Sequence, residues 1–301
     1  MDQKPVAGQE ALVPPDAETA RRYLEEARAV TGRRQRAVDR RALAWLQIVS
    51  AVVTAAFLVA SVIALRRPAD GGAQALLFAF LVYGQIFSGS AQRSGLQWRF
   101  TRGQWPLVVS GAAAMVLALV AFGVAVFVPD VPWWVTVLPG ALVLLVFGGY
   151  GAVRLARASS DPPGPYLPRV PLPRGARVGT LGVGVVLGAL LMLSVAPAGV
   201  LASVLLLLLA LCVLAWFCAG ATDLGLPAIG ALWRWPHELG LAIGFTLLVG
   251  LTVFDVGRAE GGATAGVIAG CGVVLLFVGL TFVPGRGVRG CPVSPSTHAT
   301  R

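Results

Sequence analysis

The chain has 301 residues, of which 56% are hydrophobic and 13% charged, and its mean hydropathy is +0.78. A soluble domain carries about 25% charged residues, so this composition excludes an ordinary soluble protein and predicts an all-α polytopic membrane protein. The formal net charge of +10 would indicate nucleic acid in a soluble protein. In a membrane protein it reflects basic residues on the cytoplasmic side, and no nucleic-acid partner is expected.

Residues 1–42 form a polar, arginine-rich tail in which Asp16 is placed to cap a short amphipathic helix. The apolar stripe of this helix consists of Tyr23, Leu24, Ala27 and Val30. Such a helix could lie on anionic lipid or dock a protein partner. The commoner role, and the favoured one, is a solvated segment that sets the topology.

Eight apolar runs approach or reach the length of about 20 residues that a helix needs to cross the hydrocarbon layer. They cover approximately residues 43–65, 74–91, 106–128, 133–153, 178–195, 199–218, 239–255 and 264–283. With the N-terminus inside, all of the 24 lysines and arginines except Arg66, Arg67 and Arg258 fall on the cytoplasmic side. We therefore expect a multi-pass protein of the cell (cytoplasmic) membrane with both termini cytoplasmic, in which Arg66 and Arg67 snorkel to the outer headgroups.

Residues 154–177 are rich in proline and arginine and are predicted to be an extended cytoplasmic linker. They separate a first four-helix membrane half, residues 43–153, from a second, residues 178–283. The segment 284–301 is rich in small and polar residues and is predicted to be a disordered cytoplasmic tail.

The two halves carry a similar loop between their second and third helices. Trp98 and Arg99 in the first loop correspond to Trp233 and Arg234 in the second. This match indicates two parallel four-helix repeats. Arginine beside an indole could bind a lipid phosphate or an acidic partner, which makes these four residues candidates for ligand or partner binding. The ordinary alternative is anchoring at the membrane interface.

Polar side chains and glycines also occur inside the spans. Tyr83 and Gln85 are candidates for binding a polar ligand in a cavity, although such groups more often bond to neighbouring helices. Glycines at a spacing of four allow helices to approach closely, either within the chain or between the protomers of a homo-oligomer. These glycines are Gly184/Gly188, Gly240/Gly244 and Gly262/Gly266/Gly270.

The sequence offers little that could react chemically. No charged residue lies near the middle of a span, which argues against a proton-coupled pump or a voltage sensor. The two histidines, His237 and His298, lie outside the predicted spans, and the common nucleotide, hydrolase and zinc motifs are missing. We therefore expect no catalytic residue, no metal site and no cofactor.

A polar helix leads through RRALAWLQIV into the first span, which ends at Arg66, Arg67 and Pro68. This layout resembles that of uncharacterised multi-pass membrane proteins of actinobacteria, which are commonly four-helix units. The resemblance covers the general arrangement and residues 20–155. It implies a tandem of two such units and no particular activity.

These observations favour a non-enzymatic membrane subunit or partner-binding protein, because nearly all of the mass outside the membrane is cytoplasmic. Its expected partners are the lipid bilayer, a cytoplasmic protein and a second copy of the chain. The first alternative is a transporter or permease subunit energised by a separate protein. The second is a lipid-modifying enzyme that uses Arg99, Arg234, His237 and Glu238 near the headgroups.

Overall fold

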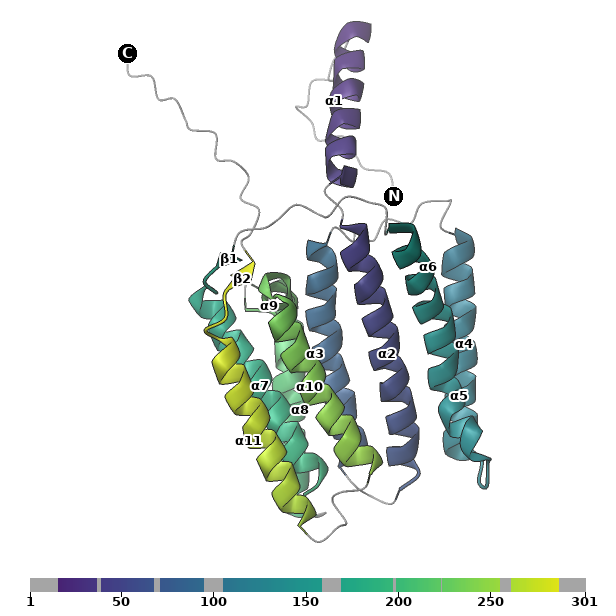
Figure 1. Cartoon of the computed structure of the whole chain (residues 1–301), viewed down its shortest axis with the longest axis vertical. Coiled ribbons are helices and arrows are strands. Elements are labelled where there is room, and N and C mark those ends of the chain that lie inside the picture. The colour runs from purple at the N-terminus through teal and green to yellow at the C-terminus, as the bar shows by residue number, and fades with distance from the viewer. Residues whose placement is uncertain are drawn as a thin grey trace, which may run out of the picture.

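The computed structural model describes residues 16–36, 39–67, 71–94, 105–158, 169–196, 199–222, 224–254 and 261–286. Within these ranges the chain is almost entirely helical (Figure 1). Eight helices are long and apolar enough to cross a membrane. The prediction of an all-α multi-pass membrane protein with eight spans is therefore confirmed.

The spans coincide with the predicted runs and differ from them only at their ends. They are α2 (Arg40–Leu65), α3 (Gly72–Arg93), α4 (Trp105–Phe127), the continuous helix of α5 (Trp133–Val143), η2 (Leu144–Gly148) and α6 (Gly149–Ala158), α7 (Arg174–Ser194), α8 (Val200–Cys218), α10 (Trp235–Val253) and α11 (Gly262–Leu280). The remaining elements are α1 (Ala17–Arg36), β1 (Arg169–Val170), η3 (Ala219–Ala221), α9 (Leu226–Leu232) and β2 (Gly285–Arg286).

Helices extend into the segment that was predicted to be a linker. α6 continues to Ala158, and α7 begins at Arg174 directly after Pro173, whose fixed φ suits a helix start. Between them β1 pairs antiparallel with β2, which places Arg169 opposite Arg286. Residues 159–168 of the linker and 287–301 of the tail lie outside the described residues, and the domain boundaries stay a prediction.

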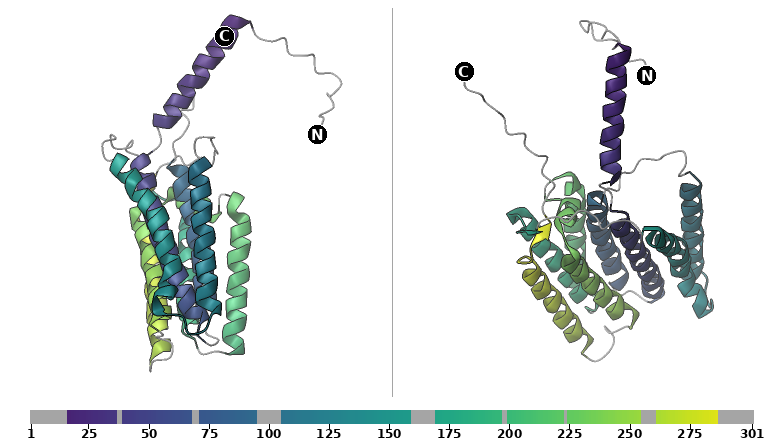
Figure 2. Two further views of the ribbon diagram at one scale, coloured as in Figure 1. Left: turned by 90° about the vertical axis from the view of Figure 1, so that its right-hand side faces the viewer. Right: turned by 45° about the horizontal axis from the view of Figure 1, so that its top comes forward.

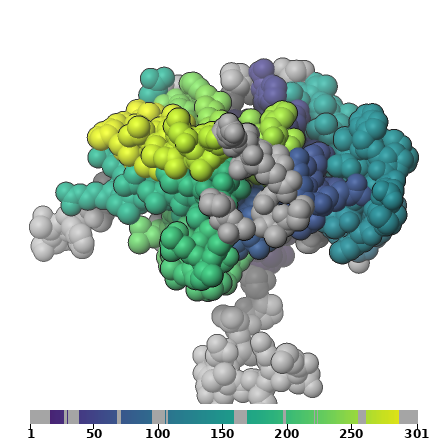
Figure 3. All heavy atoms as spheres, turned by 90° about the horizontal axis from the view of Figure 1, so that it is seen from below, coloured from purple at the N-terminus to yellow at the C-terminus, as the bar shows by residue number. Residues whose placement is uncertain are grey.

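The bundle has two ends, which are named here by what lies at each. α1 projects from the α1 end, where α2 begins and α3 ends (Figure 1). At the opposite Arg66 end, α2 ends and α3 begins. Figure 3 views the molecule from the Arg66 end, with α4 and α5 at one edge and α11 towards the other.

Within each half of the sequence the helices touch in the same pattern. In the first half α2 contacts α3, α4 and the helix that runs from α5 to α6, and α4 contacts α5. In the second half α7 contacts α8, α10 and α11, and α10 contacts α11. The internal repeat itself stays a prediction.

α3 joins the two halves. It packs against α2 on one side and against α7, α8, α9 and α10 of the second half on the other. The main hydrophobic core forms where these helices meet, and its fully buried members include Leu76, Ile86, Leu187, Leu190 and Phe277. The packing therefore does not divide the sequence halves into separate bundles.

The predicted glycine faces bring helices together inside one chain. A Cβ atom on Gly188 would lie 2.8 Å from the carbonyl oxygen of Gly270, and one on Gly270 would lie 2.7 Å from that of Gly188. α7 and α11 therefore cross backbone to backbone, as small-residue pairs permit. Gly184 and Gly240 likewise face side chains of α11. A homo-oligomer stays a prediction, and its protomers would have to meet through surfaces other than these glycine faces.

Arg66 and Arg67 bind the C-terminal ends of two helices. Arg66 donates to the carbonyl oxygens of Ala125 and Val128 at the end of α4, at 2.5 and 2.9 Å. Arg67 donates to those of Thr252 and Val253 at the end of α10. Terminal carbonyls lack an intrahelical partner and carry partial negative charge. These guanidinium groups thus bind helix ends, and the expectation that they also snorkel to the outer headgroups stays a prediction.

Candidate functional site

A short helix, α9, lies within the predicted loop 219–238 and packs along the last turns of α3. Its first turn contains Pro227, where a missing N–H costs no intrahelical bond. A Cβ on Gly89 would lie 1.9 Å from the carbonyl oxygen of Pro227, and one on Gly230 would lie 2.3 Å from that of Ile86. Only glycine at these two positions allows α9 and α3 to touch through their backbones.

α9 leads into a polar cluster, the Trp233 corner, in which Arg93 and Glu238 are partly exposed and the other members are buried. It consists of Ser90, Arg93, Thr180, Trp233, His237 and Glu238. Trp233 at its centre has 0% relative exposure. Its indole Nε1 donates to Thr180 Oγ1 of α7 at 3.0 Å, and its ring stacks on His237 with centroids 5.7 Å apart. The corner therefore fastens α7 to the turn between α9 and α10.

Both ring nitrogens of His237 are engaged. Nδ1 accepts a hydrogen bond from the Arg234 backbone N–H at 3.4 Å, so the hydrogen resides on Nε2, which donates to the Leu280 carbonyl oxygen at 3.1 Å. The ring thus links the start of α10 to the end of α11. Neither nitrogen is free to act as a general base or to bind a metal.

Arg93 supplies the positive charge of the corner. Its Nη1 donates to the carbonyl oxygens of Trp233 at 2.5 Å and Ala231 at 3.3 Å, and its Nη2 lies 3.9 Å from a Glu238 carboxylate oxygen. The Ser90 hydroxyl lies 3.3 Å from the same carboxylate oxygen. Arg93 therefore satisfies carbonyls at the end of α9 that would otherwise lack a partner.

The repeated loop predicted four candidate residues, and the structure does not bring the two that it describes together at one site. Trp98 and Arg99 lie outside the described residues. Trp233 is buried, whereas Arg234 is partly exposed and forms the N-cap of α10. The Trp233 indole and the Arg234 guanidinium thus do not form one surface. Arg93 and Thr180 are the residues that the sequence interpretation missed, because their role depends on where α9 folds back.

Tyr83 and Gln85 have different neighbours. Tyr83 is buried among aromatic rings, which include Phe87 and Phe245, and its hydroxyl lies near that of Ser50. Gln85 points towards η3, where its Oε1 is 3.6 Å from the position of a Cβ on Gly220. Residues two apart on a helix diverge by roughly 200°, which explains the separation. Ligand binding by either residue stays a prediction.

The most exposed apolar side chains at the α1 end include those of α1. Tyr23 is 64% and Leu24 58% exposed, and among the described residues α1 makes no substantial contact with another element. The side chains of Ala27 and Val30 lie outside the described residues. α1 projects away from the bundle in each view rather than lying across it (Figures 1 and 2).

Asp16 caps α1 as predicted, because its Oδ1 accepts the Thr19 backbone N–H at 3.0 Å. Hydrogen bonds from the Thr19 hydroxyl and backbone lower the pKa of the Asp16 carboxyl from its ordinary value. An ion pair between Glu18 and Arg22, at 2.6 Å, spans the first turn. Contacts within its first turn therefore stabilise α1, and its apolar side chains Tyr23 and Leu24 are exposed.

Within the described ranges no group of three or more His, Cys, Asp or Glu side chains could hold a metal ion. Comparison of the chain with protein-family models, curated proteins and solved structures finds no match in any of the three. The arrangement itself thus offers two features: a buried corner that fastens helices together, and an exposed helix at the same end of the bundle.

Proposed function

We propose that the chain is a non-enzymatic subunit of a complex in the cell membrane, and that it binds a cytoplasmic protein through α1. The observation that carries the proposal is the exposure of Tyr23 and Leu24 on a helix that makes no substantial contact with another element among the described residues. Large apolar side chains gain free energy when a partner covers them. A helix in the plane of the headgroups would suit a lipid surface, but α1 projects away from the bundle (Figure 2).

The distribution of charge supports a cytoplasmic location for the α1 end. Basic residues favour the cytoplasmic side; the sequence of α1 is rich in arginine, and its Arg21 and Arg22 are exposed. Arg66 and Arg67 lie at the opposite end, but helix C-termini bind their charges. These two arginines therefore give little reason to place the Arg66 end, rather than the α1 end, in the cytoplasm.

The interior favours a subunit over the two alternatives. The core between α3, α7, α10 and α11 is filled by apolar side chains such as Leu187, Leu190 and Phe277, whereas a transporter needs a path for a polar solute. A lipid-modifying enzyme would need a free base, and both nitrogens of His237 are bonded. Each point supports the partner-binding proposal.

The test places a photo-crosslinking amino acid at Tyr23 of the full chain in native membranes. Trp45 is the matched control, because it is aromatic and 52% exposed but belongs to the apolar span α2. We expect one discrete protein adduct from position 23 and lipid adducts from position 45. The adduct from position 23 should disappear in a Leu24→Ser variant whose bundle unfolds at an unchanged temperature.

The proposal fails if position 23 yields only lipid adducts or none. It also fails if the purified chain, reconstituted alone, transports a solute or converts a lipid. A protein adduct that persists in the Leu24→Ser variant would equally count against α1 as the docking element.

A further inference from the structure

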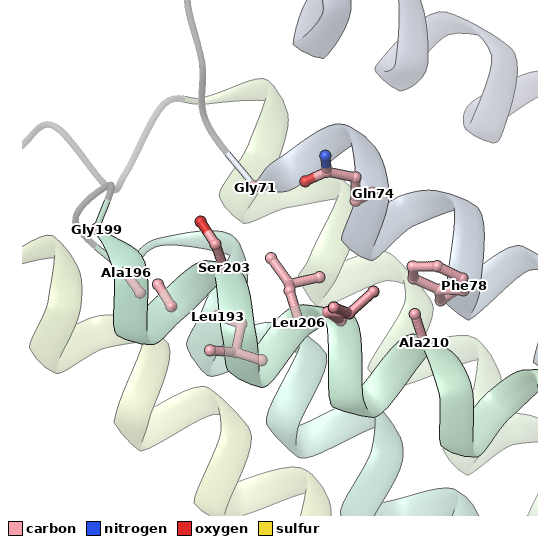
Figure 4. Close-up of a pocket in the computed structure, with 11 residues that line it drawn as sticks. Gly71, Gln74, Phe78, Leu193, Ala196, Gly199, Ser203, Leu206 and Ala210 are labelled. Atoms are coloured by element: carbon pink, nitrogen blue, oxygen red, sulfur yellow. The ribbon is translucent and has the colours of Figure 1, made fainter.

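A cleft of about 500 Å³ lies between α3 and α8 at the Arg66 end (Figure 4). Among the described residues that line it, the polar side chains are those of Gln74 of α3 and Ser203 of α8. Phe78 and Ala210 lie farther along the same cleft (Figure 4). The lining is thus polar near the end of the bundle and apolar towards the middle of the membrane.

A second hollow, of about 250 Å³, continues the first. It shares Phe78 and Ala210 with the cleft and extends to Phe217, and every side chain that lines it is apolar. From Ser203 to Phe217 a helix rises about 21 Å. This length exceeds the roughly 15 Å of hydrocarbon in one leaflet. The two hollows form a groove that could accommodate the full depth of a leaflet.

The groove exists because α8 is held away from α3. Only Leu206 and Val213 of α8 are buried, and α8 stands apart from the other helices in the left view of Figure 2. Leu206 sets the spacing at the Arg66 end, where a Cβ on Gly71 would lie 2.8 Å from its Cδ1. Both walls belong to membrane spans, so hydrocarbon rather than water is the medium that fills the space between them.

We propose that this groove binds one acyl chain of a glycerolipid, whose ester groups lie at Gln74 and Ser203. The amide N–H of glutamine and the hydroxyl of serine can each donate a hydrogen bond to an ester carbonyl oxygen. The apolar part of the groove then receives the chain. None of the described residues that line the two hollows is charged, so their side chains offer the headgroup no ionic partner.

A hollow on another face provides an internal comparison. Between α10 and α11 lies a space of about 450 Å³, and the described residues that line it are all apolar, among them Ile243, Ala269 and Leu276. It offers no side chain that could bind an ester group. The proposed site differs from this hollow in having a polar end, and it should retain lipid more strongly.

The experiment uses the full chain in nanodiscs of phosphatidylcholine that contain a small fraction of phosphatidylcholine with a photoreactive group along one acyl chain. Mapping of the adducts should show labelling of Phe78, Ala210 and Leu214 several-fold above that of Leu208. Leu208 is 53% exposed, lies on α8 and does not line the groove. Labelling should also exceed that of Ile268, which lines the hollow between α10 and α11.

Two tryptophan variants make the test specific. Ala210→Trp fills the place where the two hollows meet, and Leu208→Trp places the same ring outside the groove. Native mass spectrometry after detergent washing should show one retained lipid in the wild type and in Leu208→Trp, and several-fold less in Ala210→Trp. Replacing phosphatidylcholine by anionic phosphatidylglycerol should leave the retained fraction unchanged.

Equal labelling of Ala210 and Leu208 would overturn the proposal, because it would indicate ordinary surrounding lipid. Unchanged lipid retention in Ala210→Trp would overturn it as well. Retention that depends on headgroup charge would contradict the placement of uncharged esters at Gln74 and Ser203. The unfolding temperature of each variant separates loss of the groove from loss of the fold.

Discussion

The indole Nε1 of Trp233 donates to the hydroxyl oxygen of Thr180 at 3.0 Å. The Thr180 hydroxyl in turn donates to the Ala176 carbonyl oxygen at 2.7 Å, which leaves its oxygen free to accept from the indole. Both side chains have 0% relative exposure. A buried N–H group without a partner is costly, so this pair determines where the turn between α9 and α10 can sit against α7.

Replacement of Trp233 by alanine should destabilise the whole second half of the bundle. The substitution removes a fully buried ring together with its hydrogen bond, and large-to-small changes of this kind cost about 3–5 kcal/mol. The measurement is the free energy of unfolding in mild detergent. Trp235→Ala is the control, because Trp235 is 64% exposed, and it should change stability by about 0.5 kcal/mol or less. Similar losses in the two variants would contradict the burial of Trp233.

Thr180→Val tests the hydrogen bond apart from the packing, because valine has nearly the shape of threonine. The variant leaves the Trp233 N–H buried without an acceptor, and we expect a loss of about 1–3 kcal/mol. In a Trp233→Phe background there is no indole N–H, so the same change should cost clearly less. The difference between the two backgrounds, measured as a double-mutant cycle, gives the coupling. A coupling of zero would show that the bond does not form.

The eight spans could be predicted from the sequence because the membrane imposes their length. A helix that crosses hydrocarbon must satisfy its backbone internally over about 20 residues, so apolar run length alone located them. The same argument placed Trp233 in a cytoplasmic loop near the interface, whereas the structure buries it at the end of α9. The sequence did not predict α9, because a helix of seven residues is too short to show a periodic pattern.

The Trp233 corner could not be predicted because it depends on contacts between distant segments. Arg93, at the end of α3, binds carbonyls at the end of α9, and Thr180 accepts from an indole 53 positions away. The sequence shows that an arginine near the end of a span is tolerated. It does not show which helix end that arginine contacts. The close glycines Gly89 and Gly230 were the one available signal, and it becomes informative only once α3 and α9 are known to touch.

Gly89→Ala should displace α9 from α3. Its Cβ would lie 1.9 Å from the Pro227 carbonyl oxygen, so the backbone of α9 must move, and overpacking of this kind costs about 1–3 kcal/mol. Hydrogen exchange of the amides of residues 226–232 should accelerate. Gly84→Ala on the same helix is the control, because its Cβ would meet nothing within 4 Å apart from the adjacent backbone of α3. Its stability should be unchanged or slightly higher, since alanine favours helix. Equal exchange in both variants would refute the close contact.

Arg66 and Arg67 are adjacent, yet they bind the ends of two helices from different halves of the sequence, and their removal should act on those ends separately. Arg67→Leu should accelerate hydrogen exchange in the last turn of α10, where the arginine binds the Thr252 and Val253 carbonyl oxygens. Arg66→Leu should do so in the last turn of α4, at Ala125 and Val128. Bonds from a charged donor contribute about 1.5–3 kcal/mol each, and the field of the helix end adds to them.

Each variant is the other's control. If both changed the two ends equally, the arginines would act through general surface charge; if neither changed its own end, the capping contacts would be without effect.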